Sequence, residues 1–186
     1  MTLEHRIAVL ASGRGSILEA LLATSLPITC VLADRPCAAL GIAEAVGVPA
    51  KLVERSSYRA DFDRHAYTTE VIEVLQGEQI DLVVLAGFMT IFDAAFVDAW
   101  PGRILNTHPS LLPSFPGAHP VRDAMSAGVK VTGCTVHIVT AGVDAGPIVA
   151  QQAVPVLPGD DESSLHERIK QVERGLLPKT IEEFLQ

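Results

Sequence analysis

The sequence predicts an α/β protein built on a single open, mostly parallel twisted sheet flanked by helices. Short apolar runs alternate with helix-length segments along the chain, and residues 6–22 read as a strand, a glycine-containing turn and a helix. Residues 81–86 form a continuous apolar run, as expected for a strand covered on both faces. At 186 residues the chain is long enough for one domain with a substantial core.

The expected elements follow in a regular order. Strands are expected at residues 6–10, 28–33, 50–53, 81–86, 131–140 and 148–156, and one more contains Asn106 and His108. Helices are expected at residues 17–22, 38–46, 59–76, 93–99 and 120–128, followed by a long closing helix. The run Ser164-Leu165-His166-Glu167 has a capping-box pattern that predicts the start of this closing helix. Pro178 is expected to kink or interrupt it.

Composition narrows the classes of partner. The chain has 14 Lys and Arg against 22 Asp and Glu, a net charge of −8, so we expect no nucleic-acid partner. No apolar run approaches the roughly 20 residues that cross a bilayer, and no signal-peptide pattern precedes the first strand. We therefore expect a cytoplasmic protein that binds small molecules rather than a membrane. Its three cysteines and its histidines show no metal-ligand spacing, so no metal is expected.

Polar chemistry stands where the strand before the Pro-rich loop of residues 109–116 ends. Asn106 and His108 project from the same face of this strand, because successive strand side chains alternate. Asp144 lies in a glycine-rich turn after the next expected strand. An amide donor, an imidazole and a carboxylate together suit acyl transfer. The alternative is that each residue is satisfied by local backbone.

The acyl-transfer interpretation has a consequence for the nucleophile. No serine stands in a Gly-x-Ser-x-Gly elbow, and no cysteine adjoins His108. The attacking group therefore belongs to a substrate, and the acyl group passes directly without a covalent enzyme intermediate.

The turn Gly13-Arg14-Gly15-Ser16 lies between a strand and a helix, where backbone N–H groups can hold a phosphate. A tight turn without a ligand is the alternative. Asp34 ends the second expected strand and is placed as a ribose-binding acid of an NAD domain would be. The third glycine of the dinucleotide fingerprint is missing, with Leu18 in its place, so an ordinary strand-ending turn is favoured.

Two charged residues interrupt apolar stripes of expected helices. Glu173 lies within the stripe of the closing helix, at i+4 from Ile169, and is expected to face inward. It either forms a buried ion pair, for example with an arginine, or contacts a cationic or amide part of a ligand. Arg64 stands at the end of another stripe, where an extended arginine reaching solvent is an equally good interpretation. His137 is expected to pack within its strand.

The chain resembles the phosphoribosylglycinamide formyltransferases, folate-dependent enzymes of purine synthesis, over nearly its whole length. The motifs that carry this resemblance are Ala-Ser-Gly-Arg-Gly-Ser at 11–16, Val-Val-Leu-Ala-Gly-Phe-Met at 83–89, Asn-Thr-His-Pro-Ser-Leu-Leu-Pro at 106–113, Phe-Pro-Gly at 115–117 and Val-Asp-Ala-Gly-Pro-Ile at 143–148. The resemblance implies a Rossmann-like formyltransferase fold in a single domain, residues 1–186. A phosphate-binding half spans about 1–100 and a folate-binding and catalytic half about 81–186.

The resemblance also implies a reaction and a set of site residues. The reaction is transfer of a formyl group from 10-formyltetrahydrofolate to the amine of glycinamide ribonucleotide, by a monomer or homodimer without a metal. The implied catalytic residues are Asn106, His108 and Asp144. Those for the phosphorylated acceptor are Arg14, Gly15, Ser16, Ile17 and Glu173. Those for the folate are Arg64, Met89, Thr90, Ile91, Phe92, Asn106, Thr140 and Val143.

Two departures from the family pattern concern the periphery of the implied site. Arg14 and Ile17 stand where the family commonly has asparagines, so phosphate affinity is the property they would alter. The chain stops at Gln186, whereas many relatives carry a C-terminal extension; we expect this to trim the periphery rather than the site.

Four rival functions remain at this level. Hydrolysis of formyltetrahydrofolate would normally bring an N-terminal regulatory domain, and tRNA formylation would bring an RNA-binding domain and a basic surface. Formylation of amino sugars uses a similar Asn, His and Asp set. A non-catalytic sensor of folate or of a phosphorylated metabolite is the rival from another class.

Overall fold

The computed structural model describes residues 5–186. It divides into two compact units that meet in the sequence between Ile104 and Leu105, within strand β5 (Ile104–His108). The predicted α/β class, with an open, mostly parallel sheet flanked by helices, is confirmed.

Unit 1 contains four parallel strands in the order β3-β2-β1-β4. They are β1 (Ile7–Ala11), β2 (Ile28–Ala33), β3 (Ala50–Leu52) and β4 (Leu82–Leu85). All five residues of β1 are fully buried, because neighbouring strands flank it and both of its faces are covered. The central place of β1 explains why its sequence is apolar throughout rather than alternating.

Four helices complete unit 1: α1 (Ser16–Leu22), α2 (Ala38–Ala45), α3 (Arg64–Gly77) and α4 (Ala94–Ala99). The sequence-based start of α3 at residue 59 is wrong. The Asp63 side chain accepts a hydrogen bond of 2.9 Å from the Ala66 N–H and so begins the helix at Arg64. Asp93 caps α4 in the same way, through the Ala95 N–H at 3.0 Å.

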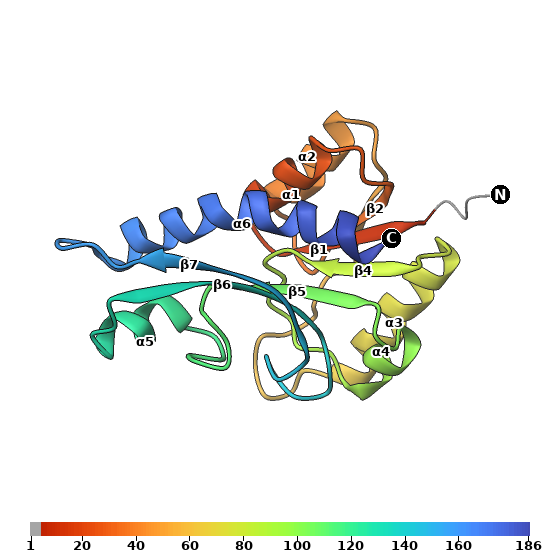
Figure 1. Ribbon diagram of the computed structural model, residues 1–186. Helices are drawn as coiled ribbons and strands as arrows, with labels where there is room; N and C mark the ends of the chain where they lie inside the picture. The colour runs from red at the N-terminus through yellow and green to blue at the C-terminus, as the bar shows by residue number, and fades with distance from the viewer. Residues whose placement is uncertain (1–4) are drawn as a thin grey trace. The chain divides into compact units, whose positions relative to one another are not determined.

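Unit 2 contains three antiparallel strands in the order β5-β6-β7, with β6 at Val131–Ile138 and β7 at Ile148–Pro155. The long helix α6 (Glu162–Phe184) runs along β7 (Figure 1) and packs on β6 and β7. Helix α5 (Pro120–Ser126) packs against α6. The core between them consists of apolar residues from all four elements: Val121, Cys134, Val154, Leu165 and Ile169.

Helix α6 differs from the sequence expectation at two points. It begins three residues earlier, because Asp161 is the N-cap and Ser164 is the third helical residue of a reciprocal capping box. It also continues through Pro178 to Phe184 without interruption. Pro178 is buried between the fully buried Leu177 and Ile181, so tertiary packing holds the helix across the missing backbone donor.

Among the helices of residues 5–186, none combines the length and the apolar content that a transmembrane span requires.

Candidate active site

The antiparallel pairing of β5 with β6 places Asn106 and His108 over polar residues of the neighbouring strand. Asn106 pairs in register with His137, and His108 pairs with Thr135. Directly opposed residues on antiparallel strands point to the same face, so these four side chains share one face of unit 2. His108, Thr135 and His137 are buried, whereas Asn106 is only half-buried. The carboxamide is therefore the member of this group that is most open to solvent.

The Pro-rich loop after β5 is held in place by hydroxyl and amide groups. Thr135 Oγ1 donates to the Ser110 carbonyl at 2.7 Å and accepts from the Leu112 N–H at 3.0 Å. Gln151 Nε2 donates to the Leu112 carbonyl at 2.8 Å. Phe115 adopts a left-handed φ of +56°, and its carbonyl lies 2.9 Å from His108 Nε2. The loop thus brings a backbone acceptor to the buried imidazole.

Asp144 joins the same cluster from the loop between β6 and β7. Its Oδ2 accepts from the Gly117 N–H at 2.8 Å and lies 3.4 Å from His108 Nδ1, and its Oδ1 lies 3.6 Å from His137 Nε2. The backbone of Asp144 has a φ of +50°, a conformation that L residues rarely adopt. The structure therefore brings together the three residues that the sequence predicted to converge.

Two histidines set the charge state of Asp144. Burial alone would raise the pKa of this carboxyl group, but the contact with His137, the Gly117 N–H and the electrostatic effect of the nearby His108 and His137 rings outweigh it. The pKa of Asp144 is consequently lower than that of an ordinary aspartate. Asp144 is thus a carboxylate at neutral pH.

The partners of His108 define how its ring is protonated. The Phe115 carbonyl can only accept, so His108 Nε2 carries a proton. Nδ1 lies 3.4 Å from Oδ2 of the Asp144 carboxylate. This contact is longer than a usual N–H···O bond, so Nδ1 is less engaged than Nε2.

His137 is the residue of this cluster to which sequence analysis assigned no role. It is 2% exposed, and its Nε2 lies 3.0 Å from Asn106 Nδ2 as well as near Asp144. Its alternation with Thr135 was visible in the sequence. What could not be read there was the register that sets it opposite Asn106, because pairing between strands is a non-local property.

The predicted phosphate loop lies in unit 1, at the start of α1. Gly15 is the N-cap with a φ of +77°, and a Cβ at this position would lie 2.8 Å from Ile42 Cδ1 and 3.2 Å from Ala39 Cα. Only glycine fits both the conformation and the space. Arg14 is exposed, whereas the Ile17 side chain is buried in the core, so Ile17 offers a ligand only its backbone N–H.

The predicted folate-contacting segment of unit 1 divides into exposed and buried residues. Arg64 is exposed, and Met89 and Ile91 are 59% and 53% exposed. Phe92 stacks on Phe96 with ring centroids 3.8 Å apart, which anchors this segment to α4.

Thr90 is 4% exposed, and its hydroxyl donates to Asp34 Oδ2 at 2.6 Å. The Asp34 carboxylate is fully buried and also accepts two hydrogen bonds from Arg35, so both side chains serve the structure of unit 1. This arrangement supports the strand-ending interpretation of Asp34 over a ribose-binding one.

The remaining predicted residues lie in unit 2. Thr140 is half-buried and Val143 is 55% exposed on the loop that carries Asp144. Glu173 faces inward from α6 as predicted and is 3% exposed. Its hydrogen-bond donor is Thr107 Oγ1 at 2.8 Å rather than an arginine. Because Thr107 alternates with Asn106 and His108, Glu173 lies at the other face of β5.

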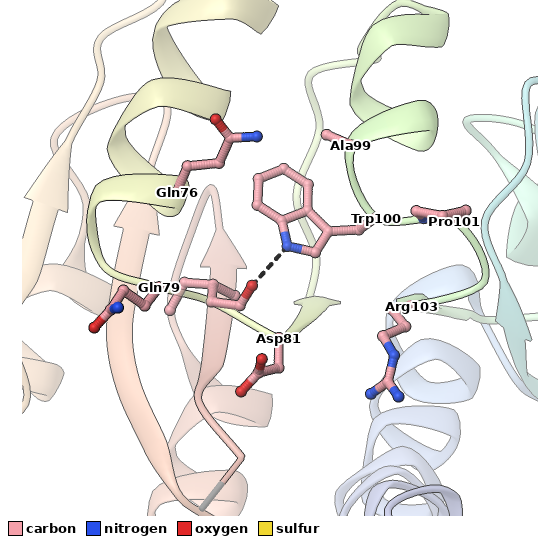
Figure 2. Close-up of a pocket in the computed structure, with 8 residues that line it drawn as sticks. Gln76, Gln79, Asp81, Ala99, Trp100, Pro101 and Arg103 are labelled. Atoms are coloured by element: carbon pink, nitrogen blue, oxygen red, sulfur yellow. Dashed lines mark hydrogen bonds between the residues drawn. The ribbon is translucent and has the colours of Figure 1, made fainter. Parts of the chain in front are cut away.

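A surface cavity of about 490 Å³ in unit 1 contains none of the predicted site residues (Figure 2). Its lining includes Gln76, Asp81, Trp100 and Arg103, and the Trp100 indole N–H donates to the Ile80 carbonyl at 2.8 Å. This cavity lies before the amino end of β4, whereas open α/β sheets bind ligands beyond the carboxyl ends of their strands. Among residues 5–186, no group of three acidic, histidine or cysteine side chains is arranged to hold a metal ion.

Comparison with known proteins gives a consistent result. Residues 5–181 match the family model described as formyl transferase. A phosphoribosylglycinamide formyltransferase of Mycobacterium tuberculosis is 49% identical over 177 residues, covering 92% of this chain and 81% of the relative. The human trifunctional purine biosynthetic protein adenosine-3 is 42% identical over 184 residues, which cover 95% of this chain and 18% of that protein.

A solved structure matches the whole chain. The crystal structure of glycinamide ribonucleotide transformylase 1 from Symbiobacterium toebii has a TM-score of 0.93 and 42% identity, and the match covers 100% of this chain and 89% of that one.

Proposed function

The chain belongs to the formyl transferase family, and from this premise we propose that it transfers a formyl group from 10-formyltetrahydrofolate to the amine of glycinamide ribonucleotide, in de novo purine biosynthesis. The observation that carries the proposal is the cluster of Asn106, His108 and Asp144 in unit 2. Hydroxyl groups near His108 do not compete as nucleophiles, since Ser110 and Thr135 donate to backbone carbonyls. The attacking group is therefore the acceptor amine.

The proposed chemistry is a direct displacement at the formyl carbon. The neutral amine attacks this carbon and forms the new C–N bond, while the carbonyl electrons move onto the formyl oxygen. N–H groups of Asn106 and His108 stabilise the oxyanion. When the oxyanion collapses, the bond to the folate N10 breaks, and the proton of the amine passes through Asp144 and water to N10. Asp144 is ionised at neutral pH and lies beside His108, so its carboxylate is free to accept this proton.

The binding roles follow the family pattern and are part of the proposal. Backbone N–H groups of the Arg14 to Ile17 segment hold the phosphate of the acceptor, and Glu173 contacts its glycinamide portion. The residues proposed to contact the folate are Arg64, Met89, Ile91, Phe92, Asn106, Thr140 and Val143, with Thr90 acting through the backbone of its segment because its hydroxyl is engaged by Asp34.

The partners we propose are therefore two small molecules. The net charge of −8 argues against a nucleic-acid partner. A cytoplasmic location and a monomeric or homodimeric state complete the proposal.

A spectrophotometric assay of folate release tests the function directly. Release of tetrahydrofolate from 10-formyltetrahydrofolate is measured with and without glycinamide ribonucleotide. We expect release only when the acceptor is present. Release without the acceptor would identify a hydrolase, and binding without release in either case would identify a sensor.

Variants of the cluster test the assignment of roles. Asn106→Ala and His108→Ala are each expected to lower kcat by about a hundredfold or more, because removal of one oxyanion donor typically costs about 3 to 4 kcal/mol. His166→Gln, a histidine on α6 outside the cluster, serves as the matched control and is expected to retain activity. Near-normal turnover of either cluster variant would remove that residue from the mechanism.

A further inference from the structure

His137 is a buried histidine whose two ring nitrogens both have partners, although the mechanism above does not use it. Nδ1 lies 3.1 Å from the carbonyl oxygen of Ile138, and Nε2 lies 3.0 Å from Nδ2 of Asn106. Oδ1 of Asp144 lies 3.6 Å from the same Nε2, beyond hydrogen-bond distance, so Asn106 is the hydrogen-bond partner of this nitrogen. The ring is 2% exposed, so solvent does not compete for either nitrogen.

These partners determine the tautomer of the ring. A carbonyl oxygen only accepts, so Nδ1 of His137 carries a proton. In a neutral imidazole Nε2 is then the acceptor, and the group within hydrogen-bond distance of it has to be a donor. The carboxamide of Asn106 satisfies this requirement only with its NH₂ end toward His137. The opposite orientation would set the Asn106 oxygen against the Nε2 lone pair.

The orientation of the carboxamide matters because the NH₂ group has two hydrogens. One is directed to His137 Nε2, and the second remains for the formyl oxygen. If the carboxamide turned over, its own carbonyl oxygen would approach the position where negative charge develops. Asn106 would then repel the oxyanion instead of stabilising it.

We propose that His137 is a positioning residue of the formyl transfer: its Nε2 accepts a hydrogen bond from Asn106 Nδ2 and thereby keeps an N–H of Asn106 directed at the formyl oxygen. This inference rests on the proposed function for its catalytic consequence. The hydrogen bond itself does not depend on that function.

A double-mutant cycle tests the catalytic consequence. His137→Leu removes the acceptor at similar volume, and we expect it to lower kcat by about ten- to a hundredfold, as misplacement of a reacting group typically does. KM for both substrates should change by less than about threefold, because the ring contacts neither of them in the proposed mechanism. His137→Gln, whose Oε1 can accept near the Nε2 position, should recover most of the loss.

The same substitution in an Asn106→Ala background separates positioning from a merely structural role. If His137 acts through Asn106, His137→Leu should lower kcat by less than about twofold once Asn106 is absent. An equal loss in both backgrounds would overturn the proposal. Thermal unfolding of each variant identifies any that fail to fold.

Nitrogen NMR of the wild-type protein with labelled histidines reports the tautomer without an activity assay. We expect a protonated Nδ1 and an unprotonated, hydrogen-bonded Nε2 for His137, assigned by its loss in His137→Gln. A ring protonated only at Nε2 would overturn the proposal. If the expected tautomer is found but no formyl transfer to glycinamide ribonucleotide occurs, the proposed function fails and the hydrogen bond stands.

Discussion

Replacement of Glu173 by glutamine tests how burial of its carboxyl group affects the stability of the protein. Glu173 is 3% exposed on α6, and burial raises its pKa from the ordinary 4.5 to about 7, although Thr107, Lys170 and Arg174 oppose the rise. A glutamine side chain at this position would have nearly the same shape and could keep the contact with Thr107, but it carries no charge at any pH.

The sign of the effect follows from proton linkage. Between pH 4.5 and about 7, the folded protein holds a proton on Glu173 that the unfolded chain has released. The free energy of unfolding therefore falls as the pH rises through this window, and the loss is complete above it. One pKa unit corresponds to about 1.4 kcal/mol, so the rise from 4.5 to about 7 corresponds to about 3 kcal/mol.

The expected result is a pH-dependent gain for Glu173→Gln over the wild type. Equilibrium urea unfolding from about pH 5 to about pH 8 measures it, and the difference in free energy of unfolding should grow by as much as about 3 kcal/mol over this range. Glu182→Gln removes the same charge from an exposed position of the same helix and should show no such growth. A difference between Glu173→Gln and wild type that stays constant with pH would refute the reasoning.

Three further predictions concern the cluster, the phosphate loop and the folate segment. Asp144→Asn should abolish most turnover, because an amide cannot carry a proton; an unchanged pH–rate profile would contradict the proton relay. Because folding lowers the pKa of Asp144, its carboxylate stabilises the wild type at pH values above the ordinary aspartate pKa. Urea unfolding should therefore show that the stability deficit of Asp144→Asn shrinks as the pH falls through the lowered pKa. Gly15→Ala should lower stability by about 1 to 2 kcal/mol or more and raise KM for the phosphorylated acceptor, because a Cβ there meets Ile42 and Ala39 at a left-handed φ. A Cβ at Gly13 meets nothing within 4 Å, so the control variant Gly13→Ala should be tolerated. Thr90→Val should cost about 1 to 3 kcal/mol in thermal unfolding by removing a donor from buried Asp34, and a neutral result would show that Arg35 alone satisfies this carboxylate.

Local patterns in the sequence predicted most of the elements and part of the site. Alternation along a strand sufficed to place Asn106 and His108 on one face, because this property depends only on neighbouring residues. Helical periodicity likewise predicted that Glu173 faces inward. Where local rules compete, the prediction was less accurate: Asp161 rather than Ser164 caps α6, and packing carries that helix through Pro178.

The contacts that complete the cluster depend on residues far apart in the sequence. His137 lies 31 residues from Asn106 in the sequence. Asp144 lies 27 residues from Gly117, and its carboxylate accepts a hydrogen bond from the Gly117 N–H. Thr90 looked available to a ligand until the structure showed its hydroxyl on Asp34, at a separation of 56 residues. Such pairings depend on strand register and loop path, which no short window of sequence encodes.

By itself the sequence determined the α/β class, the membership of the formyl transferase family and the amide, imidazole and acid that carry the proposed chemistry. These follow from side-chain type and local periodicity, which are properties of the chain before it folds. Only the tertiary structure decided that a second histidine orients the amide, that Glu173 is buried against Thr107, and that Asp144 is held as a carboxylate. Those facts depend on burial and on hydrogen bonds between distant residues, and these arise only when the strands and α6 have packed.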